Sequence, residues 1–392
     1  MFWNINTTLA FRQTPVNICT TSSDVIARVL TSDTIRVMID IESLSSQVKH
    51  NCNISDARHW GYYSLCGLLL RLRELYRSEK GIPLWEGMAQ EDIGEWISSR
   101  ENLWRELEDK ELTPITMNGN VFGPFEIEKI NTELEKHGLI YGAGFGVYRK
   151  PCFFLADLLS RKKMNGFDVY VAGAEYARDL SDHPAMLQEN VIYARIEPTK
   201  LLIWTRFEEM RCKGKSALMF AFANYGISPG EAPSQDIEQR ISLIAHAEAE
   251  TYIHHEIGEA VEGEKIGAEW KAFLTSLPAG RVELFARAVK DILADTCNNG
   301  MLNYIIHKQK AGSLGFYLVF LSGMRKLLFP EMQDAFSLFA GSGDWALIDH
   351  ARKAGYTKAC GYVERLLSVH RKYTGKESVA GVIEREILSG LL

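Results

Sequence analysis

Apolar residues recur every three or four positions along most of the second half of the chain, the spacing of one face of an α-helix. Gly, Pro, Asn and Ser residues interrupt this pattern, so we predict a succession of separate helices from residue 235 onward. The predicted helices are 235–262, 266–277, 280–296, 300–328 with a break at Gly312, 331–339, 344–354, 358–373 and 377–391.

The first half combines two patterns. Residues 34–41, TIRVMIDI, alternate apolar and polar positions and contain β-branched side chains, which favours a half-buried strand. Residues 139–172 predict short strands around a Gly-rich turn and one helix. Further helices are predicted at 57–80, 89–112, 125–137 and 198–226, the last broken at Lys213-Gly214.

The helix at 57–80 has clear end signals, with Ser55-Asp56 at its start and Gly81 after its last residue. Its middle, 62–72, is apolar nearly all round, so we expect it in the centre of the core.

These elements predict a mainly α fold, with a helical C-terminal region and a smaller mixed α+β N-terminal region. The loop YGISPGEAPSQD at 225–236 is rich in turn-forming residues and is the best candidate for a domain boundary. We therefore predict a mixed region at 1–230 and an all-helical region at 231–392.

Composition narrows the classes of function. The chain has 392 residues, of which 46% are hydrophobic and 24% charged, with a net charge of −6. This balance argues against a nucleic-acid or anionic-membrane partner. No apolar run approaches the roughly 18 residues that a membrane span needs. Seven cysteines without a C-x-x-C motif, and a start unlike a signal peptide, predict a reducing, cytoplasmic location.

The segment ISLIAHAEAETYIHHEIGEAVEGE at 241–264 carries the candidate chemistry. On a helix, His246, Glu250 and His254 form a row within or beside the apolar stripe. Buried imidazole and carboxylate groups are costly unless they are paired or bind a metal. Residues four apart can share one ion, and a bridging Glu250 would let two ions use all three residues.

This row predicts a metal site for iron, manganese or zinc, because histidine and carboxylate ligands suit those ions. Later helices would supply further ligands, and the candidates are His307, His350, Glu364 and His370. The alternative is a polar cluster that satisfies itself without an ion.

The overlapping segment His255-Glu256-Ile257-Gly258-Glu259 resembles the zincin metalloprotease motif H-E-x-x-H, with Glu in place of the second His. The resemblance implies that His255 and Glu259 bind zinc and that Glu256 is the general base. His255 and Glu259 lie on the helix face that we predict to be solvated, together with Glu248 and Glu262, and Glu256 lies at its edge. The alternative is therefore a surface pair of His255 and Glu259. Asp291 and Asp295 are predicted to face water as well.

We therefore expect a metal-binding helical protein. If it is an enzyme, it is a metal-dependent oxidoreductase or hydrolase in which the ion activates water or oxygen for a small-molecule substrate, and Glu256 is the candidate catalytic residue. The alternatives are a zincin-like metallohydrolase and a non-enzymatic scaffold or ligand-binding protein.

Overall fold

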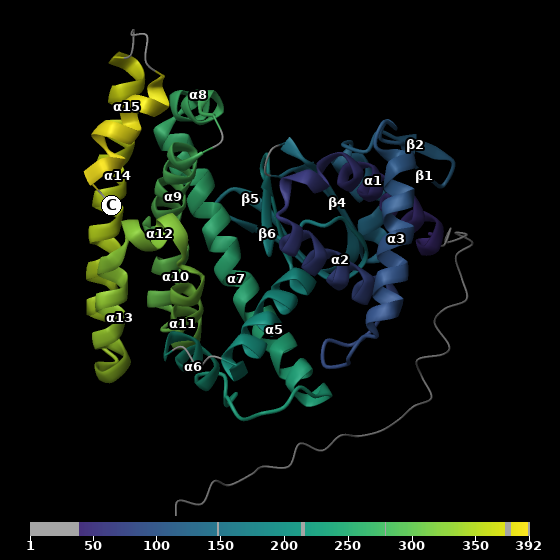
Figure 1. Ribbon diagram of the computed structural model, residues 1–392, viewed down its shortest axis with the longest axis horizontal. Coiled ribbons are helices and arrows are strands. Elements are labelled where there is room, and N and C mark those ends of the chain that lie inside the picture. The colour runs from purple at the N-terminus through teal and green to yellow at the C-terminus, as the bar shows by residue number, and fades with distance from the viewer. Residues whose placement is uncertain (1–38, 147–148, 213–215, 279, 373–377, 391–392) are drawn as a thin grey trace, which may run out of the picture. The chain divides into compact units, whose positions relative to one another are not determined.

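A computed structural model describes residues 39–146, 149–212, 216–278, 280–372 and 378–390. Residues from Ile39 onward form one compact unit (Figure 1). Helices predominate and strands occur only in the N-terminal half of the described residues, so the predicted fold class is confirmed. The helices are α1 (Ile41–His59), α2 (Leu65–Lys80), α3 (Gln90–Leu107), α4 (Ile127–Leu134), α5 (Ile196–Cys212), α6 (Ser216–Ala223), α7 (Gln235–Ile266), α8 (Ala268–Ser276), α9 (Arg281–Thr296), α10 (Met301–His307), α11 (Ala311–Phe320), α12 (Gly323–Leu328), α13 (Pro330–Ser342), α14 (Trp345–Lys372) and α15 (Val379–Glu386).

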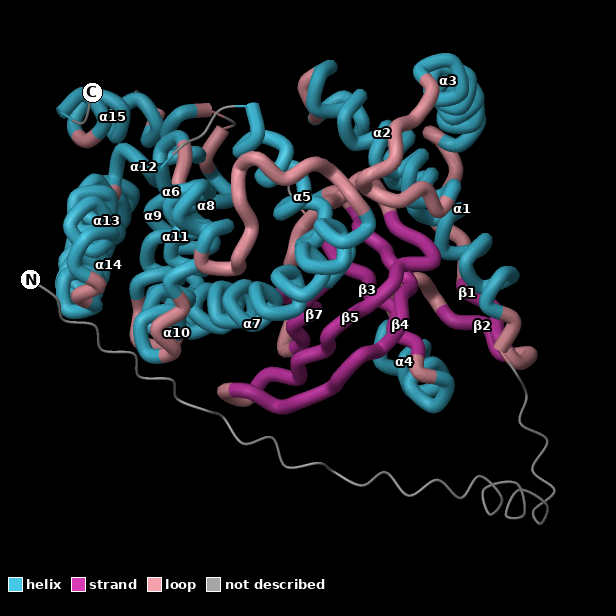
Figure 2. Tube along the Cα trace, turned by 90° about the horizontal axis from the view of Figure 1, so that it is seen from below, coloured by secondary structure: helices cyan, strands magenta, loops and turns pink. Residues whose placement is uncertain are grey.

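The strands form two sheets. The larger sheet has the order β3-β4-β5-β7-β6, in which β5 and β7 are parallel and the other neighbours antiparallel. Figure 2 shows the strands in magenta, with helices on both sides of the larger sheet. Asn165-Gly166 joins β4 to β5 with positive φ at both residues, as a tight hairpin turn requires. The strands are β1 (Ile115–Met117), β2 (Asn120–Phe122), β3 (Leu139–Phe145), β4 (Pro151–Met164), β5 (Phe167–Arg178), β6 (Ala185–Gln188) and β7 (Val191–Arg195).

Two layers of helices pack against the larger sheet. Helix α1 begins at the N-cap Asp40 and places Leu44 and Val48 in a core shared with β3 and β4. Helices α5, α6 and α7 form another core with β5 and β7. In Figure 1, α7 separates the sheet from the remaining C-terminal helices, and its contacts with β6, β7, α9 and α10 agree.

The remaining helices form a core centred on α9, which contacts α7, α12 and α14. Gly312 lies in the first turn of α11, where a Cβ would approach Tyr225 to 2.4 Å. The predicted break in 300–328 is displaced: the chain is non-helical at 308–310, between α10 and α11, and again at 321–322, between α11 and α12. Gly312 itself is helical and permits close packing. The predicted helices at 344–354 and 358–373 are one helix, α14.

The prediction for 57–80 is right at its end and wrong at its start. Gly81 caps α2 with a φ of 63°, but the helix begins after Ser64, and α1 occupies the preceding residues. Leu65 is 73% exposed and Leu70 59% exposed, so this segment is not the centre of the core. The reason is that α2 buries only one narrow face, which carries Leu68, Leu72 and Leu75.

Two strand predictions have different outcomes. Residues 34–38 lie outside the described residues, and Ile41 at the end of the predicted strand begins α1. Strands are confirmed at 139–172, but β4 and β5 are long and the helix predicted there is wrong. The apolar run of β4 lies in a central strand with cores on both faces, which removes the alternation that marks an exposed strand.

Among the helices of the described ranges, none combines the length and the apolar character that a membrane-spanning helix requires.

Candidate metal centre

The structure separates the three residues of the predicted metal row. His246 is exposed, and its Nδ1 lies 2.8 Å from the Ser242 carbonyl oxygen. The Glu250 carboxylate accepts hydrogen bonds of 2.6 and 2.8 Å from Lys162 Nζ. The His254 ring stacks on Tyr304 with ring centres 4.2 Å apart. Each side chain thus has its own partner, and the geometry does not gather them around one position.

The predicted apolar stripe of α7 is right in part. Ile253 and Ile257 on this stripe are buried, but Leu243 on the same side is 72% exposed. The face that we predict to be solvated is wrong, because Glu248 and Glu262 are each 3% exposed and the isoleucines at 237, 241 and 244 are buried on that side. Because the sheet and α5 cover one side of α7 while α9 and α10 cover another, its middle has no broad solvated face.

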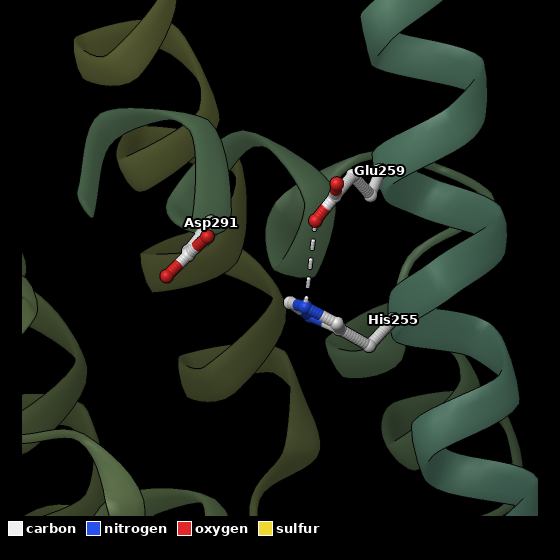
Figure 3. A group of neighbouring side chains, drawn as sticks. All are labelled: His255, Glu259 and Asp291. Carbon is white, nitrogen blue, oxygen red and sulfur yellow. Dashed lines mark ion pairs between the residues drawn. The ribbon is translucent and has the colours of Figure 1, made fainter. Parts of the chain in front are cut away.

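What the structure does bring together is His255 and Glu259 of α7 with Asp291 of the neighbouring helix α9 (Figure 3). One potential ligand atom of each lies within 4.8 Å of the others. His255 Nε2 and Glu259 Oε2 are 4.0 Å apart. The spacing of four residues places the two α7 side chains on one face of that helix, toward α9.

Asp295 contacts the second ring nitrogen of His255, Nδ1. His255 Nδ1 lies 2.7 Å from Asp295 Oδ1, and Asp295 is only 1% exposed. An imidazole that donates from Nδ1 to a buried carboxylate presents Nε2 as its free nitrogen. Asp295 Oδ2 has no hydrogen-bond partner among the described residues, and Arg325 Nη1 lies 3.8 Å from it.

Charges around the cluster shift its proton affinities. Burial opposes protonation of His255, but the Asp295 carboxylate outweighs it and raises the pKa of His255 to about 10. Burial favours the neutral form of Glu259, but Lys290 Nζ at 2.7 Å and His255 outweigh it and lower the pKa of Glu259. Without an ion, His255 is therefore an imidazolium held by carboxylates.

Burial is the main cause of the pKa shifts of two further carboxyl groups, Glu256 and Asp291. Burial raises the pKa of Glu256 to about 7, with His255 opposing the shift and Glu259 adding to it. Burial also raises the pKa of Asp291, again opposed by His255. Glu256 is thus poised to exchange a proton near neutral pH.

A cavity of about 320 Å³ lies beside the cluster. His255, Glu256 and Asp295 form part of its wall. His183, Pro184 and Ala185, which lie just before and at the start of β6, contribute from the sheet side. Its apolar wall consists mainly of Tyr252, Met301, Phe316, Tyr317 and Phe320. A polar group at the edge of an aromatic cavity is the arrangement that small-molecule sites commonly have.

One imidazole and two carboxylates are a ligand set that iron, manganese or zinc would accept. The zincin-like pattern indicated His255, Glu256 and Glu259, whereas Asp291 and Asp295 were predicted to face solvent. The sequence shows that Asp291 and Asp295 are four residues apart on a predicted helix. It does not show that this helix, α9, packs against α7, because that contact depends on tertiary structure.

Comparison with known protein families gives two matches. Residues 43–195 match the N-terminal domain, and residues 200–389 the C-terminal domain, of a family of unknown function (DUF6866). The two matches meet near the start of α5, whereas the boundary that we predict after residue 230 stays a prediction. A search of curated proteins and a search of solved structures found no match. Since the two matches run consecutively over most of the chain, the protein belongs to this family of unknown function, DUF6866.

Proposed function

We propose that His255, Glu259 and Asp291 bind one divalent iron, manganese or zinc ion, and that the ion activates a water molecule for hydrolysis of a small molecule in the adjacent cavity. The observation that carries this proposal is the convergence of three ligand atoms within 4.8 Å from two helices. The proposal moves the metal from the row of His246, Glu250 and His254 to the neighbouring face of α7.

Geometry supports a single shared ion. Ligand atoms about 2.1 Å from one ion lie about 3.4 Å from each other in tetrahedral geometry. The distance of 4.0 Å between His255 Nε2 and Glu259 Oε2 exceeds this spacing by about 0.6 Å, so binding requires side-chain rotations that draw the three groups together. The Asp295 carboxylate would keep His255 in the tautomer that a metal requires.

Charge supports a cation at the same position. Glu256, Glu259, Asp291 and Asp295 bring four carboxyl groups together, while Lys290 and Arg325 are the neighbouring fixed cations in ion-pair contact with them. A divalent ion would replace the proton on His255 and neutralise the remaining carboxylates. Binding should therefore release a proton from His255, because a metal ligand must be a neutral imidazole.

Glu256 would be the proton acceptor. A base is most effective when its pKa is near the working pH, and burial raises the pKa of Glu256 to about 7. Glu256 borders the cavity, and it follows His255 directly as the base does in the H-E-x-x-H pattern. An ion at this position would lower the pKa of a bound water, whose proton Glu256 would accept. The cytoplasmic location that the sequence favours remains part of this proposal.

Elemental analysis of protein purified without a nickel column tests the proposal. We expect close to one iron, manganese or zinc ion per chain in the wild type, and loss of the ion on His255→Ala. His246→Ala is the matched control on the same helix and should keep the ion. Loss on His246→Ala with retention on His255→Ala would return the site to the row predicted from the sequence.

The alternative is an ion-free polar cluster with a structural role, which the His255 pKa of about 10 favours. It predicts that neither the purified protein nor protein titrated with these ions binds metal, while His255→Ala still destabilises the fold. That pair of results would reject the metal proposal in favour of a scaffold.

A further inference from the structure

A second cavity, of about 610 Å³, lies away from the candidate metal centre. The C-terminal end of α2 and the loop 81–85 form one wall, and the end of β5 with the first turns of α5 and α7 form the other. Its volume is in the range of sites that hold small organic ligands. Residues of both family domains contribute to it.

Most charged side chains of this cavity are already paired. Glu175 Oε1 lies 2.7 Å from Arg195 Nε, Lys200 Nζ lies 2.8 Å from Glu238 Oε1, and Glu74 Oε2 lies 3.2 Å from Arg77 Nε. These pairs balance each other in charge. They hold the walls of the cavity in place, and their charged groups already have partners.

Two lining residues of opposite charge remain without an ion pair in the described part of the chain, Glu197 and Arg178. Arg178 donates from Nη2 to the Glu74 carbonyl oxygen at 3.2 Å, but its buried Nε has no hydrogen-bond partner. Burial raises the pKa of Glu197, and nearby Glu175 raises it further, while Lys200 and Arg178 oppose the shift. The lining therefore contains one buried donor without a hydrogen-bond partner and one carboxyl group without an ion pair.

Glu175 supplies an independent indication of a ligand. Its side chain is 2% exposed, and Oε2 is buried without a hydrogen-bond partner while Oε1 binds Arg195. A buried carboxylate oxygen without a donor is costly, and native proteins rarely leave one in that state. A ligand cation that reaches Glu175 and Glu197 together would satisfy this oxygen and separate the two negative charges.

We propose that this cavity binds a small zwitterion of the amino-acid or dipeptide class. The ligand's ammonium group donates to Glu197 and Glu175 Oε2, and its carboxylate accepts from Arg178 Nε. Ile82, Leu84 and Trp85 line the wall beside these groups and suit an apolar side chain on the ligand. Charge-assisted hydrogen bonds at both ends would select molecules that carry both charges.

Calorimetric titration of the full chain tests this with the free amino acids, apolar dipeptides such as leucylleucine, and the N-acetylated and C-amidated forms of each. At least one unblocked compound should bind, and blocking either end should weaken its affinity by about tenfold or more. Equal affinity for blocked and unblocked compounds, or no binding by any compound at about 10 mM, would overturn the proposal. These measurements use the wild type, so they do not depend on the folding of a variant.

Charge-removing variants then assign the contacts. Glu197→Gln should weaken binding of the unblocked compound and leave that of its N-acetylated form unchanged. Arg178→Gln should weaken binding of the unblocked compound and leave that of its C-amidated form unchanged. Glu208→Gln on α5 and Arg73→Gln on α2 are matched controls, since neither residue lines this cavity. Equal losses in the control variants would contradict the assignment.

Discussion

Gly258 of α7 lies directly against the backbone of Ala294 of α9: a Cβ at Gly258 would lie 2.2 Å from the Ala294 carbonyl oxygen. Gly258 is between His255 and Glu259 in sequence, and Ala294 directly precedes Asp295. The close approach of the two helices at this glycine therefore sets the distance between the α7 and α9 groups of the candidate metal centre.

Replacement of Gly258 by alanine should disturb both stability and metal binding. The added methyl group meets a backbone oxygen that cannot move alone, so we expect destabilisation of about 1–3 kcal/mol and weaker metal affinity. Gly263→Ala is the matched control, because nothing lies within 4 Å of its Cβ and alanine favours a helix. Urea denaturation and metal titration measure both effects. A Gly258→Ala protein as stable as the control would show that the helices are not in close contact.

Asp295→Asn should weaken metal binding without removing a ligand. The asparagine keeps the size of the side chain but no longer anchors the His255 ring as an anion. Losing such a partner typically lowers metal affinity by about 10–100-fold. Calorimetric titration with zinc or manganese gives the affinity. An unchanged affinity would mean that Asp295 does not orient the histidine.

The pKa of Glu256 predicts how metal-free protein responds to pH. Its ordinary value is 4.5, and burial raises it to about 7 in the folded protein. Between these values the folded protein keeps a proton that the unfolded chain has released, so the free energy of unfolding falls as pH rises. Glu256→Gln removes this titration and should be more stable than wild type above about pH 7, by on the order of 1–3 kcal/mol.

Denaturation in the presence of a chelator at several pH values measures this difference. The advantage of Glu256→Gln should disappear near about pH 4, where Glu256 is protonated in both states. A difference that stays constant over the whole range would show that Glu256 titrates normally. In the wild type the His255 contribution is present below its ordinary value of 6.5 and lost as pH rises through about 10. The Glu256 carboxylate is one cause of this raised pKa, so the contribution is smaller in Glu256→Gln.

The ion pair between Glu250 and Lys162 should matter little. Their side chains are 33% and 36% exposed, and pairs of this kind contribute about 0–1 kcal/mol. Glu250→Gln should therefore leave the metal content unchanged and reduce stability only slightly. Metal analysis and thermal denaturation check both points. Loss of the metal would restore Glu250 as a ligand.

Local signals predicted much of the fold. Gly81 and Gly138 end helical segments in the left-handed conformation, as predicted. The hairpin of β1 and β2 was not predicted, although the Asn-Gly pair at 118–119 between the two strands is a local signal for such a turn. Errors arose where tertiary packing decides the outcome. The exposed leucines at the start of α2 and the buried glutamates of α7 both depend on which elements lie alongside.

The same limit applies to the candidate site. The zincin-like pattern placed His255, Glu256 and Glu259 near one another, because residues four apart share a helix face. Asp291 and Asp295 lie about 35 to 40 residues after His255 in sequence. The hydrophobic pattern of α9 does not indicate which helix packs against the face that carries these two aspartates. Only the contact between α7 and α9 joins the two halves of the centre.

Anomalous diffraction from crystals grown with manganese or zinc would locate a bound ion. We expect one peak within about 2.3 Å of His255 Nε2 and of carboxylate oxygens of Glu259 and Asp291. A peak among His246, Glu250 and His254, or no peak at saturating metal, would rule out a metal at these three residues.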